Sequence, residues 1–155
     1  MKLNPDWEYV ADTVMGGVSS GAVTREDVAG REAARLSGEV SLDNNGGFIQ
    51  MAFDLAGGDV MDVSGFAGVE MQVYGNVAGY ELRLRTDQLS RPWQSFRAGF
   101  DAPSQWQTLQ LPWAAFEAHR TDAVLDPARL RRMGVLAIGS EMQADIAIAE
   151  IGFFR

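Results

Sequence analysis

Hydrophobic and polar positions alternate with a period of two along most of this sequence. In the range 47–55, Ile49, Met51 and Phe53 fall on one face of an extended chain, and Gln50 falls on the other. The same alternation recurs in the ranges 21–25, 35–42, 69–74, 80–85, 93–100, 106–111, 134–140 and 145–154. This period is typical of half-buried strands, and sustained helical periodicity is nearly absent. The pattern therefore predicts a series of short β-strands.

The connections between these strands contain the residues that turns require. We expect the glycine-rich run at 44–47 to join the strands at 35–42 and 47–55 in a hairpin-like connection. We also expect the apolar face of 80–84 to pair with that of the strand before it.

Three local features refine the predicted elements. A single helical turn is predicted at 113–116, directly after Pro112, which ends the preceding strand because it has no N–H to donate. A second turn is predicted at 126–131, with an aspartate as N-cap and a proline at the first helical position. In 145–154 the apolar residues change parity, so a β-bulge near 149–150 is predicted to keep them all in the core.

Nine or ten short strands with glycine turns and little helix predict an all-β protein, a β-sandwich of the jelly-roll type. No internal repeat, low-complexity tract or linker divides the sequence. The 155 residues are enough for one hydrophobic core. We therefore expect a single domain over residues 1–155.

Composition and charge exclude several classes of function. The formal net charge is −8, which argues against binding to a nucleic-acid backbone. The sequence has no cysteine, so disulfides and thiolate zinc sites are excluded. No apolar run approaches the roughly 20 residues of a membrane-spanning helix. The first six residues resemble neither a signal peptide nor a transit peptide, and we expect a cytoplasmic protein.

Two glycine-containing loops interrupt the alternation, Asp-Thr-Val-Met-Gly-Gly-Val-Ser at 12–19 and Asp-Asn-Asn-Gly-Gly-Phe at 43–48. We predict that they meet and form the most specialised surface of the molecule. In one interpretation this surface binds a ligand or partner, because glycines allow close backbone approach. In the other, the polar residues cap turns and the glycines adopt backbone angles that other residues avoid. The candidate binding residues are Asp12, Met15, Gly16, Gly17, Ser19, Asn44, Asn45, Gly46, Gly47 and Phe48.

A second candidate surface is the polar face of the middle strands. Gln72 and Tyr74 are predicted to lie beside Glu81, Arg83 and Arg85, because same-face residues of adjacent strands are neighbours. Trp93 is the tryptophan that we expect to be most exposed. Such a face can bind sugars through aromatic stacking and planar polar groups, or it can be an ordinary solvated sheet surface.

Neither an active site nor a metal site is predicted. Glu70 and Glu81 share the polar face, but the neighbouring arginines would lower their pKa values rather than create a catalytic acid. One histidine, His119, and no cysteine exclude a conventional transition-metal site. Carboxylates that could hold a structural calcium are present, but their spacing is not that of an EF-hand loop, so we predict no metal and no cofactor. These carboxylates are Asp12, Asp43, Asp145 and Glu150.

Four motifs together resemble the complex I intermediate-associated protein 30 family. They are Asp12-x-x-Met15-Gly16-Gly17-x-Ser19 after Trp7, Asn44-Asn45-Gly46-Gly47-Phe48, Tyr80-x-Leu82-x-Leu84-Arg85, and Trp106-x-x-Leu109-x-Leu111-Pro112-Trp113-x-x-Phe116. The resemblance implies a galactose-binding-like jelly roll, related to many carbohydrate-binding modules. The mitochondrial members of the family are assembly factors for respiratory complex I, and this chain resembles a short bacterial member without their N-terminal extension.

These observations lead to one expectation and one alternative. We expect a non-catalytic, chaperone-like assembly module that binds a protein partner through the two glycine loops. The alternative is a carbohydrate-binding module that uses the polar sheet face. An apolar patch around Met15 and Phe48 would favour a protein partner, and exposed aromatic rings on the polar face would favour a sugar.

Overall fold

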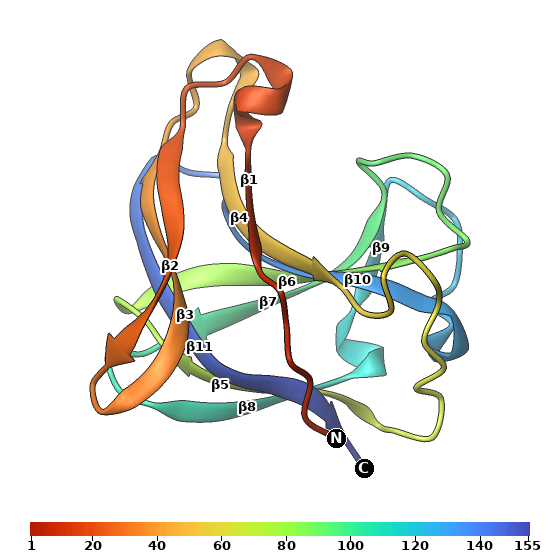
Figure 1. The fold of residues 1–155 in the computed structure, drawn as a ribbon. Coiled ribbons are helices and arrows are strands. Elements are labelled where there is room, and N and C mark those ends of the chain that lie inside the picture. Colours follow the sequence, from red (N-terminus) through yellow and green to blue (C-terminus); the bar gives the residue numbers. More distant parts are fainter.

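The protein is a sandwich of two antiparallel β-sheets (Figure 1). The computed structural model describes residues 1–155, apart from the side chains of Met15 and Asn45. The six-stranded sheet has the order β1 (Glu8–Ala11), β4 (Phe48–Asp54), β10 (Leu130–Ile138), β6 (Ala78–Thr86), β7 (Ser95–Ala102) and β9 (Glu117–His119). The five-stranded sheet has the order β2 (Ser20–Val28), β3 (Arg31–Val40), β11 (Met142–Phe154), β5 (Gly68–Tyr74) and β8 (Gln107–Pro112). The all-β prediction is confirmed.

Helical structure in the described residues is limited to single 3₁₀ turns. These are η1 (Asp12–Met15), η2 (Asp43–Asn45), η3 (Trp113–Ala115) and η4 (Pro127–Arg129). The two predicted turns are confirmed as η3 and η4, and the Asp126 carboxylate caps η4 by accepting a hydrogen bond from the Ala128 N–H. No helix in the described part of the chain is long and apolar enough to cross a membrane.

The core lies between the two sheets and consists of the apolar side chains that alternate along each strand and face inward. Ile49, Met51 and Phe53 of β4 are buried, as their alternation predicted. In β11 the predicted bulge is present, because the register with β5 shifts between Ile148 and Glu150. This shift keeps Ile151 on the core side after the change of parity. Each fully buried side chain of this size contributes about 1.5–3 kcal/mol to folding.

Two predictions about the connections are wrong. β5 and β6 do not pair with each other but belong to different sheets, because the turn after Tyr74 carries the chain across the sandwich. That turn is fixed by two N–H groups, since Gly75 donates to Pro103 and Val77 donates to Ala102. β3 and β4 also lie in different sheets, so the loop between them is not a hairpin. The strand predicted at 35–42 also ends earlier than expected: β3 ends at Val40, and Leu42, which its alternation placed on the apolar face, is 47% exposed.

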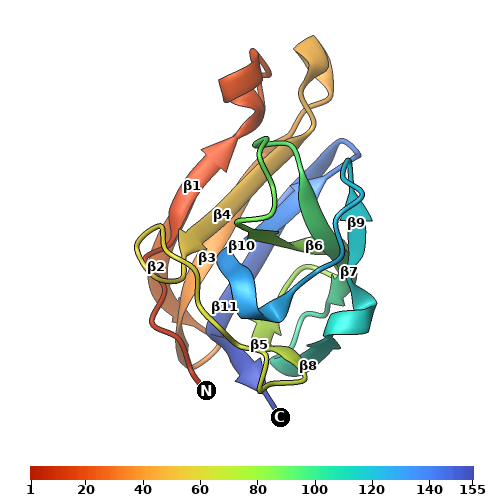
Figure 2. The same ribbon diagram turned by 90° about the vertical axis from the view of Figure 1, so that its right-hand side faces the viewer.

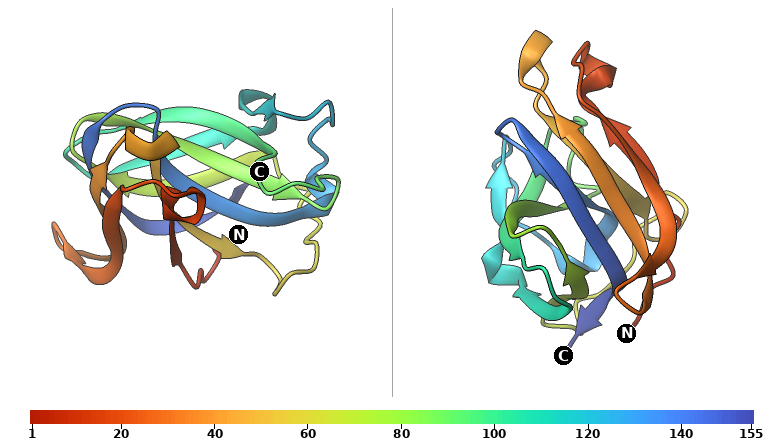
Figure 3. Two further views of the ribbon diagram at one scale, coloured as in Figure 1. Left: turned by 90° about the horizontal axis from the view of Figure 1, so that it is seen from above. Right: turned by 90° about the vertical axis from the view of Figure 1, so that its left-hand side faces the viewer.

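Two loops at one end of the sandwich connect the sheets in opposite directions. The loop containing η1 runs from β1 to β2, and the loop containing η2 runs from β3 back to β4. They protrude side by side beyond the sheets, as both Figure 2 and Figure 3 show. The fold therefore brings together the two glycine loops that are far apart in the sequence.

Candidate functional site

The centre of this site is the carboxylate of Asp12, which joins the two glycine loops. Asp12 is fully buried. Its Oδ1 accepts a hydrogen bond from the Ser19 N–H at 3.1 Å. Its Oδ2 accepts from the Gly47 N–H at 2.6 Å, from the Phe48 N–H at 3.3 Å and from the Ser19 hydroxyl. One side chain thus satisfies three backbone donors from both loops, which we call the Asp12 clasp.

Ser19 provides the second link of the clasp. It is only 3% exposed, and its Oγ accepts a hydrogen bond from the Ser41 N–H at 2.8 Å while its own proton goes to Asp12. Ser41 follows β3 and precedes η2, so this bond connects the start of β2 to the end of β3. A hydroxyl is required here because the same atom both donates and accepts.

Two of the glycines are needed for space around Asp12. A Cβ atom at Gly17 would lie 2.5 Å from Asp12 Cγ, and one at Gly46 would lie 2.5 Å from Asp12 Oδ2. Neither residue has a positive φ, so their conformations are open to other amino acids. Gly16 and Gly47 differ, because their φ values of 86° and 139° disfavour a side chain. Two of the glycines are thus required for space around Asp12 and two for their backbone angles. Only the requirement for unusual backbone angles was predicted as a structural role.

The hydrogen bonds keep Asp12 ionised in spite of its burial. Burial by itself raises the pKa of a carboxyl group. The hydrogen bonds from the Ser19 hydroxyl and from the backbone of Gly47, Phe48 and Ser19 outweigh this effect, and the pKa of Asp12 lies below its ordinary value. The clasp therefore holds a negative charge at neutral pH.

Three aliphatic side chains are exposed on the outside of the clasped loops. Val14 is 74% exposed, Val18 is 50% exposed and Leu42 is 47% exposed. Val18 and Leu42 adjoin Ser19 and Ser41, whose hydrogen bond brings the two loops together. We call Val14, Val18 and Leu42 the apolar tip.

The predicted loop residues occupy three kinds of environment. Asp12, Gly17, Ser19 and Gly47 are buried; Gly46 and Phe48 are half-buried; Gly16 and Asn44 are exposed. The side chains of Met15 and Asn45 lie outside the described part of the structure. The sequence indicated the clasp residues and left open whether their polar groups contact a partner or cap turns; the buried Asp12 and Ser19 have a structural role. The prediction missed the apolar tip, although two valines in a glycine-broken loop are a signal of it.

The residues of the predicted sugar face do not share one surface. Gln72 and Tyr74 lie on the outer side of the five-stranded sheet, and Glu81, Arg83 and Arg85 lie on the outer side of the six-stranded sheet. The face was predicted from pairing of β5 with β6, and it divides because these strands are in opposite sheets. Glu70 and Glu81 are separated in the same way. Among the described residues, the half-buried Phe48 at the start of β4 is the phenylalanine, tyrosine or tryptophan on the outward parity of the six-stranded sheet.

The exposed tryptophan adjoins one of these halves from a loop. Trp93 is 56% exposed, whereas Trp7, Trp106 and Trp113 are half-buried, as predicted. The guanidinium of Arg91 lies over its ring, 5.9 Å from the centroid, within the roughly 6 Å at which cation–π contacts form. The same segment is tied to the sheet by a hydrogen bond from Arg85 to the Arg91 carbonyl.

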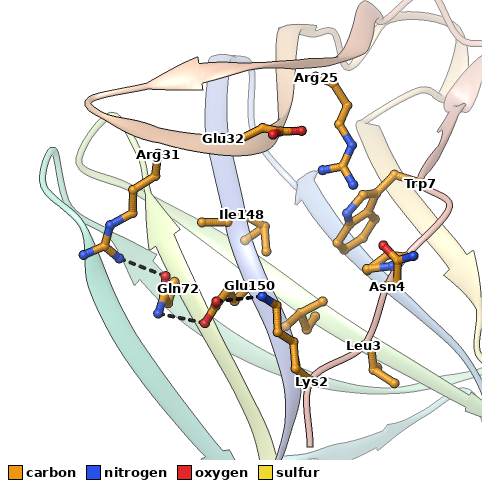
Figure 4. A pocket seen from close by; sticks show the side chains of 13 residues that line it. Lys2, Leu3, Asn4, Trp7, Arg25, Arg31, Glu32, Gln72, Ile148 and Glu150 are labelled. Carbon is orange, nitrogen blue, oxygen red and sulfur yellow. Dashed lines mark hydrogen bonds and ion pairs between the residues drawn. The ribbon is translucent and has the colours of Figure 1, made fainter.

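A groove of about 360 Å³ lies beside the other half, between the N-terminal segment and the end of the β2–β3 hairpin (Figure 4). Its floor is the bulge of β11, and the Trp7 ring lies on one wall. Along one side Arg31 donates to Gln72, Gln72 donates to Glu150, and Glu150 pairs with Lys2. On the other side Arg25, Glu32 and Asn4 have no hydrogen-bonding or ionic partner for their side chains among the described residues.

The carboxylates considered for calcium are dispersed. Asp12 is occupied by the clasp, Asp145 pairs with Arg35, and Glu150 pairs with Lys2. In the part of the chain that the structure describes, no group of three or more acidic, histidine or cysteine side chains is placed to hold a metal ion.

The two antiparallel sheets form a β-sandwich of the galactose-binding-like, jelly-roll type. Solved carbohydrate-binding modules have the same fold. The family 11 carbohydrate-binding module from Clostridium thermocellum, in complex with a β-1,3-1,4-mixed-linked tetrasaccharide, superposes with a TM-score of 0.78. It is 10% identical, over 99% of this chain and 94% of that chain. A family 30 carbohydrate-binding module from a cellulosomal cellulase of the same organism gives a TM-score of 0.69 at 13% identity, over 98% and 94% of the two chains. At these identities the similarity shows the fold alone.

The family itself follows from the sequence. The model of the complex I intermediate-associated protein 30 family matches residues 2–148. The chain belongs to this family, as its glycine-loop motifs indicated. No curated protein matches the sequence.

Proposed function

We propose that this protein is a non-catalytic assembly module that binds a protein partner through the apolar tip. The observation that carries the proposal is the exposure of Val14, Val18 and Leu42 on two loops that a buried hydrogen-bond network holds in place. An exposed apolar patch is typical of a protein-binding site, and the Ser19–Ser41 hydrogen bond brings together the two loops that carry these side chains. The family description supports an intermediate of respiratory complex I as the kind of partner.

The clasp supports this proposal by limiting the cost of binding. A loop that is already ordered loses little conformational entropy when a partner binds. Asp12 and Ser19 are buried, so they position the tip instead of contacting the partner. A non-catalytic role is also supported by the positions of Glu70 and Glu81. A glycosidase needs two carboxylates close together, and these two lie on opposite sheets.

Replacing the three tip residues with serine is expected to reduce binding to the partner at least tenfold while the fold is retained. Each buried CH₂ group contributes about 0.8 kcal/mol, so three aliphatic side chains together exceed the roughly 1.4 kcal/mol of a tenfold change in affinity. The matched control is the Val77→Ser, Val124→Ser double variant, because these valines are 76% and 82% exposed elsewhere on the molecule. Affinity capture with quantification of the recovered proteins tests this, and equal recovery by the tip variant and wild type would refute the tip as the interface.

A second candidate function is carbohydrate binding, and the groove in Figure 4 favours it. Sugar hydroxyls both donate and accept hydrogen bonds, and the groove offers an unpartnered guanidinium at Arg25, a carboxylate at Glu32 and an amide at Asn4. An aromatic ring, Trp7, lines the same space. The fold that the chain shares with carbohydrate-binding modules supports this candidate, although the predicted sheet face does not exist as one surface.

A glycan array tests this second candidate. Wild type is expected to bind at least one oligosaccharide, and the Arg25→Ala, Glu32→Ala double variant is expected to lose at least tenfold in affinity because two polar contacts are removed. The Arg83→Ala, Arg85→Ala variant, on the opposite sheet, serves as the control. Failure of wild type to bind any glycan would eliminate the candidate.

A further inference from the structure

Arginines gather on the outer face of the six-stranded sheet in an otherwise acidic protein. The strand register places Arg83 of β6 opposite Arg97 of β7, and Arg132 of β10 opposite Arg85 of β6. Directly opposed residues have Cβ atoms about 5 Å apart, and like charges at such positions are destabilising. Carboxylates share this face, so the feature to explain is which arginines they leave unpaired.

Only part of this cluster is neutralised by neighbouring carboxylates. Arg83 pairs with Glu81 at 3.0 Å, and Arg132 pairs with Glu8 and Asp54 at 2.7 and 2.9 Å. The half-buried Arg97 has no hydrogen-bonding or ionic partner for its side chain among the described residues, although Glu117 lies opposite it in the register.

Arg85 is the second arginine without a counter-charge. Its guanidinium donates one hydrogen bond, from Nη2 to the Arg91 carbonyl oxygen at 2.9 Å, and its buried Nε has no partner. Burial lowers the pKa of Arg85, and the positive charges of Arg131 and Arg132 lower it further. The surroundings of this side chain therefore disfavour its charge, and no anion in the described part of the protein compensates for it.

An unpartnered hydroxyl lies next to Arg85. Leu84 pairs with Phe96, so the next outward positions along β6 and β7 are Arg85 and Ser95. Ser95 is only 4% exposed, and its Oγ has no partner. Among the described residues, Arg85 Nε and Ser95 Oγ are the two buried side-chain polar atoms left without a hydrogen bond. Buried polar atoms without a hydrogen bond are rare in proteins. Both of these can donate, and both belong to the adjacent positions Arg85 and Ser95.

His119 completes the cluster on the neighbouring strand. It lies opposite Ser95 in the register of β7 with β9. Burial lowers the pKa of His119, and the charges of Arg97, Arg83 and Arg120 lower it further, more than Glu81 raises it. These contributions show that the ring lies within the field of several guanidinium groups.

We propose that Arg85, Arg97 and His119 form a binding site for an oxyanion, either a carboxylate or a phosphate group. A guanidinium presents paired N–H donors that match both groups, and such charge-assisted hydrogen bonds are roughly twice as strong as neutral ones. The unpartnered Ser95 Oγ and Arg85 Nε lie buried on the same two strands. This site is on the opposite sheet from the groove and does not depend on the apolar tip.

Titration with inorganic phosphate, sodium glucuronate and glucose, followed by amide chemical shifts in low salt, tests the proposal. Wild type is expected to bind phosphate, glucuronate or both, more weakly as salt is added, and not to bind glucose. The anion that binds identifies the source of the oxyanion. If neither anion shifts the resonances of β6, β7 and β9, the proposal is overturned.

Two variants assign the binding to this site. Arg97→Gln and His119→Gln are each expected to weaken anion binding, Arg97→Gln by about tenfold, the equivalent of one charge-assisted hydrogen bond. The control is Arg25→Gln, which removes an exposed, unpartnered arginine on a different part of the molecule. Anion affinity unchanged in both cluster variants, each with the thermal midpoint of wild type, would also overturn the proposal.

Discussion

Asp12→Ala is expected to lower the free energy of unfolding by about 3 kcal/mol or more. The substitution leaves the N–H groups of Ser19, Gly47 and Phe48 buried without their acceptor. Each buried group left unsatisfied costs about 1–3 kcal/mol, and the losses are not fully additive because water enters part of the space. Urea denaturation at neutral pH measures the change.

The matched control for this variant is Asp43→Ala. Asp43 is an exposed carboxylate at the start of the second glycine loop, and its side chain accepts no hydrogen bond among the described residues. Its removal is expected to change the free energy of unfolding by less than about 0.5 kcal/mol, as for most surface substitutions. Equal losses in the two variants would contradict the clasp.

The clasp also predicts the direction of the pH dependence. The pKa of Asp12 is lower in the folded protein than in the unfolded chain, where it takes its ordinary value of 3.8. Its stabilising contribution is therefore complete above that value and is lost as the pH falls through the lower, folded pKa. Asparagine does not titrate, so Asp12→Asn should not show the loss of stability that protonation of Asp12 causes in wild type. The difference in free energy of unfolding between wild type and Asp12→Asn is therefore expected to narrow below pH 3.8.

Gly46→Ala is expected to be the second most damaging change, at about 1–3 kcal/mol, the usual cost of forcing atoms into a packed interior. The new methyl group would lie 2.5 Å from Asp12 Oδ2 and 2.8 Å from the Ser41 carbonyl oxygen. Backbone strain makes no contribution, because φ at Gly46 is −75°. Thermal or urea denaturation measures the loss.

The control for this substitution is Gly65→Ala, which separates space from backbone freedom. A Cβ at Gly65 has no neighbour within 4 Å, and its φ is not positive. This substitution is expected to be neutral or to stabilise the protein by about 0.4–1 kcal/mol through the unfolded state. If Gly46→Ala changed the free energy of unfolding no more than Gly65→Ala does, this result would contradict the close packing of Gly46 against Asp12.

Much of the fold could be predicted from the sequence because strand periodicity is a local property. The alternation in 47–55 fixed which side chains of β4 face the core, and the parity change in 145–154 located the bulge. The partners of each strand could not be predicted in the same way. A turn that crosses to the other sheet has the same glycine-rich composition as a hairpin turn, which is why β5 was wrongly paired with β6.

The candidate site was predicted in its position but not in its burial. Glycine-rich motifs indicated that residues 12–19 and 43–48 belong together, and the structure joins them through Asp12. The sequence could not show which side of the loops faces inward, since these residues follow neither strand nor helix periodicity. Val14 and Val18 were therefore overlooked, while for Asp12 and Ser19 a binding role and a structural role both remained open.

The clasp gives the polar residues and glycines of the two loops a structural role and leaves the proposed binding role to their exposed side. A charged, fully hydrogen-bonded residue fixes two loops from different sheets relative to each other. The apolar tip is then held in one arrangement at the end of the sandwich. Stability and binding can accordingly be altered by different residues of the same two loops.

Site-specific photocrosslinking from the apolar tip tests the proposed docking most directly. A photoreactive residue is placed at Val14 in one variant and at Val77, equally exposed on another part of the molecule, in a second. We expect a discrete crosslinked protein partner from position 14 that is absent from position 77 and is lost when Val18 and Leu42 are replaced by serine. The same products from both positions, or none from position 14 in the organism's own extract, would contradict it.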